Sequence, residues 1–439
     1  MLKELLYNGA WILPNYLTYK SFNKSIKNVA KTQERVLFKI LRSNIDTSYG
    51  KHCEFSKINN VSDFQKYVKI SDIWDYENYI NNNVELFVPT SGSTSKSKNI
   101  PYTNNLKKQF HKGLFVWMFD TYLNNKSLFF GKIYFSISPE VKKNQKVGFE
   151  DDSDYFGMFR RYFLNKLFVV PKEVKLIQDT ETFQYVTLLF LLKEKNLRFI
   201  SVWSPSFLTI LLKKIPEWYE PILNDIKSGI ISKKRGMSNL LYNRLKQYLK
   251  MDLSRFNELK EAKGITELWS NLRLISCWGD SSSSFYVDEL KKLLPNSKIQ
   301  LKGLISTEGF VSFPLSNYDG HILSIQSHFF EFIDCVNKKI KLAHELELNK
   351  KYQVIITTDT LYRYDTKDTI MICGFHGECP LIRFLGRNQY VDLFGEKLSE
   401  QFISEICRNL FGRYNLKPHF FMVSPEVFNG NYNYVLFID

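Results

Sequence analysis

The sequence predicts an α/β fold with a substantial parallel sheet, extended by a β-rich part and by a small C-terminal α+β part. Four short apolar or β-branched runs, each bounded by turn residues, predict buried strands. They span residues 166–170, 199–205, 272–279 and 298–306. Helical patterns lie between them, at residues 181–196, 205–217 and 238–249. Strands that alternate with helices in this way are typical of a parallel sheet with crossover helices.

The elements before this region are predicted to be helical. Apolar residues recur at helical spacing through residues 3–45. The segments 62–70 and 71–80 each begin with Ser-Asp before an apolar run, which is a common helix N-terminus. A long helix is expected at 104–123, and the hydroxyl-rich loop before it would then lie at a helix N-terminus, where the helix dipole favours an anion.

From residue 320 onward the pattern changes to strands. Three strand-like segments span residues 321–334, 353–359 and 369–387. A chain of 439 residues with 44% hydrophobic residues is long enough for two or three domains. We expect a large N-terminal domain over residues 1–392, with a β-rich subdomain at 320–392, and a separate C-terminal part over 393–439.

Composition argues against several classes of protein. The net charge of +15 is large, but the lysines are scattered along the chain, so we expect an anionic small ligand and neither a nucleic-acid nor a membrane partner. The six cysteines form no C-x-x-C pair and are expected to be reduced core residues. No apolar run approaches the ~18 residues of a membrane span, and the first residues do not resemble a signal peptide. We expect a cytoplasmic protein.

Residues 88–103, VPTSGSTSKSKNIPYT, combine Ser and Thr hydroxyls with one glycine and two lysines. Taken alone, this stretch is either a solvated surface loop or an anion cradle. In a cradle, small residues leave backbone N–H groups free to bind a polyphosphate, and the lysines add positive charge. The spacing of the common nucleotide P-loop is absent from it.

Two further motifs follow strand-like runs. In GLISTEGFVSFPL, residues 303–315, Glu308 stands where a carboxylate can hold a Mg²⁺ ion that carries phosphate oxygens, although a turn or capping glutamate is the alternative. In residues 361–400, Asp368 precedes an apolar strand, a position from which carboxylates commonly bind a ribose. Arg387, in a Gly-Arg-Asn turn, is either a phosphate ligand or a surface ion-pair partner.

The ordered set of these motifs resembles the adenylate-forming enzymes, and within them the auxin-responsive acyl-acid amido synthetases and their bacterial relatives. The motifs TSGST, STEG, YRYDTKD, GR and GEKLSE follow one another in that family's order. The resemblance runs from about Tyr49 to the end of the chain and is weakest between residues 110 and 260. It implies a large N-terminal domain of parallel-rich sheets and helices with a β-subdomain, followed by a small mobile cap.

The resemblance also implies an activity. Such enzymes use ATP and Mg²⁺ to convert a carboxylic acid into an acyl-adenylate, and an amine, usually of an amino acid, then displaces AMP to form an amide. Glu308 would hold the metal and act in catalysis with Thr307 and Lys98, while the segment from Gly303 to Glu308 would line the acyl pocket, with Phe310 nearby. The implied nucleotide-binding residues are Thr90, Ser91, Gly92, Ser93, Thr94, Lys96, Ser306, Tyr362, Arg363, Asp368 and Arg387.

The chain departs from the family's pattern at three places. In the hydroxyl-rich loop, Ser95 and Lys96 stand where relatives generally show one or more glycines. Lys367 stands where relatives often have a glycine, directly before the ribose-binding aspartate. Residues 395–439 supply one helix and two strands, so we expect an incomplete cap without its late catalytic lysine. The alternatives to amide formation are an acid–thiol ligase that uses coenzyme A and a non-catalytic nucleotide-binding relative. The further hypothesis of a basic nucleic-acid-binding protein rests on the net charge alone.

Overall fold

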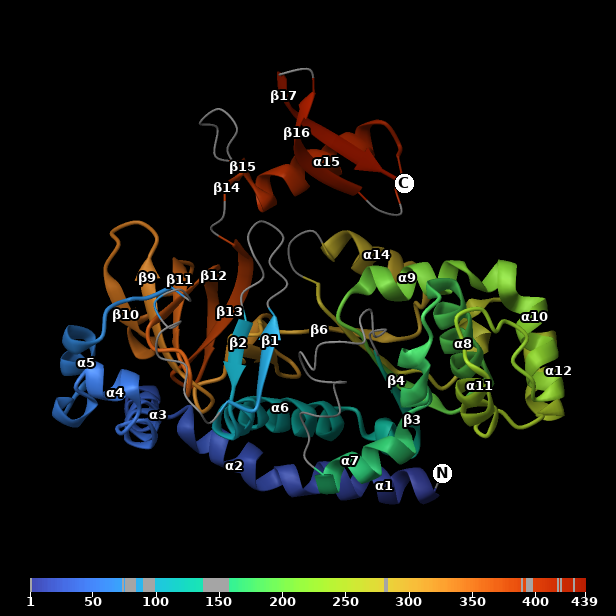
Figure 1. Cartoon of the computed structure of the whole chain (residues 1–439), viewed down its shortest axis with the longest axis horizontal. Helices are drawn as coiled ribbons and strands as arrows, with labels where there is room; N and C mark the ends of the chain where they lie inside the picture. Colours follow the sequence, from blue (N-terminus) through green and yellow to red (C-terminus); the bar gives the residue numbers. More distant parts are fainter. Residues whose placement is uncertain are drawn as a thin grey trace.

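The structure is a computed structural model of the chain. It describes residues 2–72, 75, 84–89, 99–136, 158–279, 283–387, 390–391, 398–416, 418, 421–428 and 431–439. Two sheets stand above a layer of helices, and the C-terminal elements lie over both (Figure 1). Within the described residues, no helix is long and apolar enough to cross a membrane.

A four-stranded parallel sheet holds its strands in chain order. Its strands are β3 (Lys132–Phe135), β4 (Leu197–Ser201), β5 (Leu274–Cys277) and β6 (Lys298–Leu301). All four residues of β5 are buried, as expected for a central strand with helices on both faces. The carboxyl ends of these strands meet at one edge, which is the usual place for a ligand in an open parallel sheet.

One predicted strand of this sheet is wrong. Residues 166–170 form the end of helix α7 (Met158–Leu167) and then a single bridge between Phe168 and Ile133. The first parallel strand is β3 instead, which the sequence did not reveal. Its four residues, Lys-Ile-Tyr-Phe, are too few to show a period that separates a strand from a helix.

Helices cover both faces of the parallel sheet and divide its side chains between two hydrophobic clusters. Ile133 and Phe135 of β3 belong to one cluster, and Tyr134 between them belongs to the other. The second cluster is completed by helices that follow β3 in the chain. They are α8 (Thr180–Lys193), α9 (Pro205–Lys213), α10 (Ile215–Ser228), α11 (Asn239–Lys246), α12 (Leu253–Glu261), α13 (Ile265–Leu268) and α14 (Ser284–Leu293), with the 3-10 helix η6 (Lys172–Leu176).

The second sheet is antiparallel and has seven strands in the order β10-β9-β11-β12-β13-β8-β7. These are β7 (Ser312–Pro314), β8 (His321–Leu323), β9 (Phe329–Asp334), β10 (Ile340–Leu342), β11 (Lys351–Thr357), β12 (Tyr364–His376) and β13 (Cys379–Arg387), with the 3-10 helix η8 (Ala343–Glu345). The hairpin of β12 and β13 places Asp368 directly opposite Arg387. Two residues that are distant in the sequence therefore share one end of the sheet.

The helical layer beneath the sheets comes mainly from the N-terminal part of the chain. It contains α1 (Leu2–Ile12), η1 (Leu13–Asn15), α2 (Tyr16–Ser25), α3 (Val29–Ser43), α4 (Ser48–His52), η2 (Phe55–Lys57), α5 (Val61–Tyr67), α6 (Asn104–Asn124) and η4 (Lys126–Phe130). Helix α6 runs under both sheets (Figure 1), and eight of its 21 residues belong to the first hydrophobic cluster. Thr103 caps it by accepting the N–H of Leu106 at 3.1 Å.

Two further groups of elements frame the region between the sheets. The hairpin of β1 (Leu86–Pro89) and β2 (Asn99–Tyr102) precedes α6. Beyond β13 the chain forms β14 (Tyr390–Val391), β15 (Leu398–Ser399), α15 (Glu400–Arg413) and the hairpin of β16 (Phe421–Phe428) and β17 (Asn431–Ile438). The expected boundary after residue 392 falls within 392–397, which lie outside the described residues.

Candidate functional site

The Ser306–Gly309 turn carries Thr307 and Glu308. The N–H of Ser306 donates to the carbonyl of Gly309 at 3.0 Å, and the N–H of Gly309 donates back to the carbonyl of Ser306 at 3.3 Å. Glycine at 309 lets the turn pack closely against Ile356, because a Cβ there would lie 2.3 Å from Cδ1 of that side chain. Tyr102 at the end of β2 donates its hydroxyl to the carbonyl of Thr307 at 2.6 Å. The turn is thus fixed to the strand that follows the hydroxyl-rich loop.

Asp368 is the most deeply buried acidic residue of the candidate site. Only 1% of it is exposed, and its Oδ1 accepts a hydrogen bond from Nε of Arg387 at 3.0 Å. Its Oδ2 is also buried and, within the described part of the chain, has no hydrogen-bond partner. A buried oxygen without a donor is costly, so this oxygen is suited to accept a hydroxyl of a ligand.

The charges around Asp368 shift its pKa in opposite directions. Burial raises the pKa of Asp368 to about 6, Arg387 opposes this rise, and the nearby Glu308 carboxylate adds to it. Burial alone would lower the pKa of Arg387, but Asp368 and Glu308 together raise it. Glu308 itself is 5% exposed. The structure therefore brings Glu308, Asp368 and Arg387 together, with Thr307 on the same turn as Glu308.

Lys367, the residue before Asp368, has a left-handed backbone with φ of +62°. This is a conformation that glycine adopts without cost and that a lysine adopts with strain. Asp365 stabilises it, since its carboxylate accepts the Lys367 N–H at 3.0 Å and pairs with the ammonium group at 2.5 Å. Lys367 therefore adopts the backbone conformation that glycine favours, with Asp365 as its partner.

Tyr362 and Arg363 are placed differently from the other predicted ligands. The Arg363 guanidinium donates to both carboxylate oxygens of Glu331, at 2.9 and 3.0 Å, and to two backbone carbonyls of the α5 region. The Tyr362 ring stacks on Tyr49, with centroids 4.8 Å apart. Both side chains pack between the antiparallel sheet and the N-terminal helices, so the geometry gives them structural contacts. A nucleotide-binding role for them stays a prediction.

The predicted phosphate cradle lies outside the described residues. This applies to Thr90, Ser91, Gly92, Ser93, Thr94, Lys96 and Lys98. The elements on either side are described, and they form the β1–β2 hairpin. The expectation that the loop lies directly at a helix N-terminus is wrong, because β2 (Asn99–Tyr102) separates it from α6. The loop joins two antiparallel strands instead.

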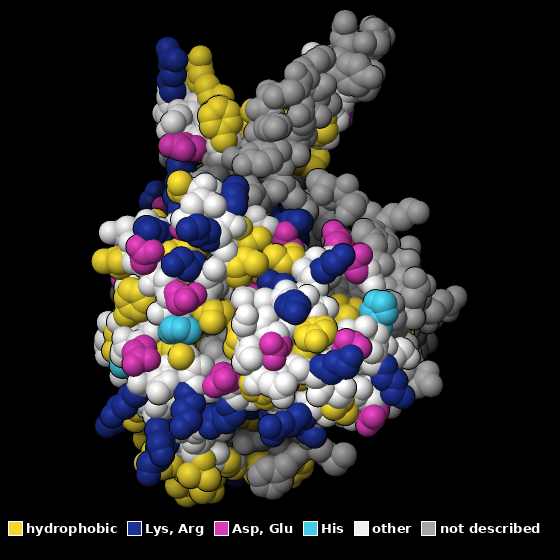
Figure 2. All heavy atoms as spheres, turned by 90° about the vertical axis from the view of Figure 1, so that its left-hand side faces the viewer, with side chains coloured by type: hydrophobic (Ala, Val, Ile, Leu, Met, Phe, Trp, Pro, Cys, Tyr) yellow, Lys and Arg dark blue, Asp and Glu magenta, His cyan; other side chains and the backbone are white. Residues whose placement is uncertain are grey.

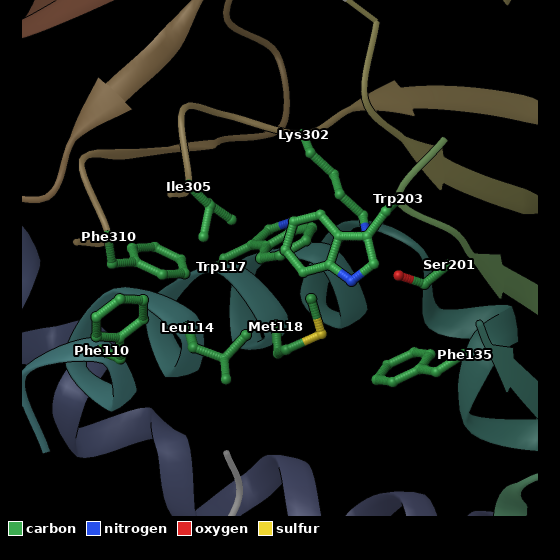
Figure 3. A pocket seen from close by; sticks show the side chains of 10 residues that line it. All are labelled: Phe110, Leu114, Trp117, Met118, Phe135, Ser201, Trp203, Lys302, Ile305 and Phe310. Carbon is green, nitrogen blue, oxygen red and sulfur yellow. The ribbon is translucent and has the colours of Figure 1, made fainter. Parts of the chain in front are cut away.

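An apolar pocket opens beside the Ser306–Gly309 turn (Figure 3). It is lined by Phe110, Leu114, Trp117, Met118, Phe135, Ser201, Trp203, Lys302, Ile305 and Phe310. Phe110 and Phe310 lie at one end, and Ser201 and Phe135 lie at the other, by the carboxyl ends of the parallel strands (Figure 3). Ile305 and Phe310 flank the turn, so the pocket adjoins the turn that carries Glu308.

Lys302 is the one charged side chain among the described residues that line this pocket. It is 2% exposed, and its Nζ lies 4.2 Å from the centre of the Trp203 ring and 6.0 Å from that of Trp117. Sequence reasoning missed this residue, together with Trp203 and Ser201. Ser201 and Trp203 come at or just after the end of β4, and Lys302 comes just after the end of β6. That position is the signal by which they could have been found.

His328 stabilises the chain directly after the Ser306–Gly309 turn. Its Nε2 accepts the N–H of Phe310 at 3.0 Å, and its Nδ1 lies 3.1 Å from Oε1 of Gln109 on α6. Burial lowers the pKa of His328 to about 3, so the ring is neutral. This residue was also missed, because one histidine in a strand-like run gives no local signal for such a contact.

Several known proteins are similar to this chain in sequence or in structure. Indole-3-acetic acid-amido synthetase GH3.4 of Arabidopsis thaliana is 22% identical over 89% of this chain and 72% of its own length. Jasmonoyl--L-amino acid synthetase JAR4 of Nicotiana attenuata is 22% identical over 84% of this chain and 71% of its own. The solved GH3.15 acyl acid amido synthetase superposes with a TM-score of 0.77 at 19% identity, covering 96% of this chain and 81% of its own.

A second structure, AtGH3.15 acyl acid amido synthetase in complex with 2,4-DB, superposes with a TM-score of 0.78 at 17% identity, covering 96% of this chain and 79% of its own. These superpositions confirm the predicted fold class. The profile of the GH3 family N-terminal domain matches residues 18–299, and that of the GH3 family central domain matches residues 321–387. The resemblance seen in the sequence is therefore confirmed, and the chain belongs to the GH3 family.

Proposed function

We propose that this chain is an ATP-dependent acyl-acid amido synthetase. It would activate a carboxylic acid as an acyl-adenylate and transfer the acyl group to an amine, with an amino acid as the expected acceptor. The observation that carries the proposal is the position of an apolar pocket directly beside Glu308, Asp368 and Arg387 in a GH3 chain. The names of its relatives, which include amido synthetases for indole-3-acetic acid and for jasmonoyl conjugates, support the amide product.

The residues present fit ATP. The buried Oδ2 of Asp368 can accept a ribose hydroxyl, and Arg387 beside it supplies positive charge for a phosphate. Glu308 would hold Mg²⁺, which when bound neutralises charge on phosphate oxygens. The described residues contain no group of three or more His, Cys, Asp or Glu that could hold a metal. A single carboxylate suits Mg²⁺ that is held mainly by phosphates and water.

The remaining steps follow from the pocket. An acid bound there would direct its carboxylate to the Ser306–Gly309 turn, and a carboxylate oxygen would attack the α-phosphorus as the bond to pyrophosphate breaks. The amine nitrogen would then attack the acyl carbon, lose a proton and release AMP. The chain contributes orientation and charge stabilisation. The loop residues from Thr90 to Lys98 would bind the departing phosphates, as the family resemblance implies.

We further propose that residues 1–392 form the adenylation part, with a β-rich subdomain at 320–392, and that 393–439 belong to the mobile cap. In support, α15 contacts the adenylation part, since Nη2 of Arg408 donates to Oγ of Ser284 at 2.5 Å. The Phe411 ring packs against Phe421 within the C-terminal part, with centroids 5.1 Å apart. The proposed location is the cytoplasm, and the proposed ligands are a small acid and an amine.

The test is exchange of labelled pyrophosphate into ATP with Mg²⁺ and a panel of aromatic and aliphatic acids. Exchange with one class of acid, lost in Glu308→Gln and Asp368→Asn, is the expected result. The product is then identified after addition of amino acids or coenzyme A, because a thioester would point to an acid–thiol ligase. ATP binding without exchange for any acid would contradict the proposal and favour a non-catalytic nucleotide-binding protein.

A further inference from the structure

The outer face of the N-terminal helices exposes an unusual set of leucines. Helix α1, the 3-10 turn η1 and helix α2 follow one another with right-handed helical backbone at their junctions. At about 100° per residue, Leu2, Leu6, Leu13 and Leu17 therefore fall on one face of this run. Their exposed fractions are 72%, 62%, 61% and 74%. We call these four residues the leucine ridge.

Basic side chains follow this ridge along the chain. Residues 2–43 contain eight Lys or Arg and two Glu, which is a net charge of +6 out of the +15 of the whole chain. Seven of these cations are exposed on α2, α3 and the turn between them. They are Lys20, Lys24, Lys27, Lys31, Arg35, Lys39 and Arg42, and we call them the basic collar. None of them takes part in an ion pair between described residues.

Helical spacing brings part of the collar together, although its cations are scattered in the sequence. Lys31, Arg35, Lys39 and Arg42 recur on one side of α3. Arg35 and Lys39 lie near enough to Lys112 of α6 that, together with its burial, their charges lower the pKa of Lys112 to about 8. Figure 2 shows Lys and Arg side chains gathered over the lower part of this face, with hydrophobic side chains beneath them.

We propose that the leucine ridge and the basic collar form a docking surface for an anionic lipid bilayer. Exposed leucines that enter the boundary between headgroups and acyl chains, beside lysines that meet anionic headgroups, are the two elements of interfacial membrane binding. This inference is independent of the proposed catalytic function. It departs from the expectation of no membrane partner, which rested on lysines that looked scattered along the sequence.

Charge argues against the other occupants of this surface. A second copy of the chain would bring an identical collar against the first, and like charges would repel. A nucleic acid would use the cations but leave four exposed leucines without a function, since its contacts are mostly polar. An anionic bilayer matches both features at once. Helices α1 and α2 run along the lower edge of Figure 1 and the C-terminal elements lie at the upper edge, so a bilayer beneath these helices would leave the candidate site facing solution.

The experiment is co-sedimentation of the full chain with two kinds of vesicle. One is pure phosphatidylcholine, and the other contains about a third phosphatidylserine. Binding is expected only with phosphatidylserine, and it should weaken in high salt because screening shortens the range of the collar's field. Lys20→Gln/Lys24→Gln/Lys27→Gln should reduce the partition coefficient about fivefold per lysine, or about 100-fold together. Leu13→Ser/Leu17→Ser should reduce it several-fold without loss of folding, because both leucines are exposed.

Matched variants control for net charge and apolar exposure. Lys246, Lys260 and Lys263 are also exposed and belong to neither the ridge nor the collar. Their triple change to Gln makes the same change in net charge. Leu240→Ser/Met251→Ser removes two side chains that are 63% and 66% exposed. Both controls should change binding less than twofold. No binding to the anionic vesicles in low salt would overturn the proposal, as would equal losses in the controls or a dimer that Leu13→Ser/Leu17→Ser dissociates.

Discussion

The backbone N–H of Phe310 donates to Nε2 of His328, and this bond fixes the imidazole as the tautomer that carries its proton on Nδ1. That proton points to Oε1 of Gln109, which also accepts the N–H of Asp359 at 3.2 Å. A neutral, buried ring thus joins the Ser306–Gly309 turn, helix α6 and the end of β11.

Replacement of His328 should therefore destabilise the fold around the turn. His328→Ala leaves the Phe310 N–H buried without an acceptor and opens a cavity, at an expected cost of about 2–4 kcal/mol in the free energy of unfolding. His328→Gln keeps an amide oxygen in reach and should cost less than half of that. Urea unfolding near neutral pH measures both variants. An alanine variant as stable as the parent would show that the bond does not hold the turn.

The same histidine predicts acid sensitivity. Its pKa is about 3 in the folded chain and 6.5 as the ordinary value, so the unfolded chain binds a proton first as the pH falls. Stability should decrease from about pH 6.5 downward, and this component should be absent in His328→Gln. Unfolding midpoints at a series of pH values, compared between parent and variant, provide the measurement. Parallel curves for the two proteins would contradict it.

Nucleoside binding should depend on the charge of Asp368. Its pKa is raised to about 6, so the carboxylate gains a proton as the pH falls through that value and no longer pairs with Arg387 as an anion. The affinity for adenosine, whose ribose has no titrating phosphate, should fall up to tenfold per pH unit below about 6. Asp368→Asn should bind more weakly and show no such dependence. Calorimetric titration at a series of pH values measures this affinity. An affinity of the parent protein that does not change with pH would refute the prediction.

Lys302 should determine affinity for the acid. It is the one charge among the described residues lining the pocket, and an anionic substrate gains most from a cation that is shielded from water. Lys302→Met keeps the volume and removes the charge, so the KM for the acid should rise about tenfold or more while the KM for ATP stays the same. Leu114→Met is the matched control in the same pocket. A change in the KM for ATP alone would place Lys302 in the nucleotide site instead.

Variants of Arg363 can distinguish a structural role in its ion pair with Glu331 from a role in nucleotide binding. Removing one partner of its buried pair with Glu331 leaves an uncompensated charge, at an expected cost of about 3–5 kcal/mol. Glu331→Gln and Arg363→Met should both lower stability, and a double-mutant cycle should show coupling between them. Nucleotide affinity of the folded fraction should remain unchanged in Glu331→Gln. A loss of affinity in Arg363→Met that Glu331→Gln does not share would restore the nucleotide-binding role.

The sequence indicated the parts of the site that are encoded locally. The Ser306–Gly309 turn depends on small residues at fixed spacing, and Asp368 and Arg387 stand beside recognisable turns. Their mutual contact was not predictable, because it depends on the register of the β12–β13 hairpin, which contains two irregularities. A shift of one residue would have placed the two side chains on opposite faces.

The pocket was harder to predict for the same reason. Trp117, Trp203 and Lys302 come from a helix and two strand ends that are up to 185 residues apart, and each looks like an ordinary core residue in its own segment. Arg363 was predicted as a nucleotide ligand from its motif. Its partner Glu331 lies on β9, two strands away across the antiparallel sheet, and only that arrangement shows the guanidinium to be occupied.

The walls of the pocket are also part of the first hydrophobic cluster. Phe110, Trp117, Met118, Phe135 and Phe310 all belong to that cluster, so an acid in the pocket would pack as though it were one more core side chain. A bound acid would fill an opening between these core side chains. Ligand at 100 times its Kd would add about 2.7 kcal/mol of stability. Thermal melting in the presence of candidate acids would therefore identify the substrate without any turnover.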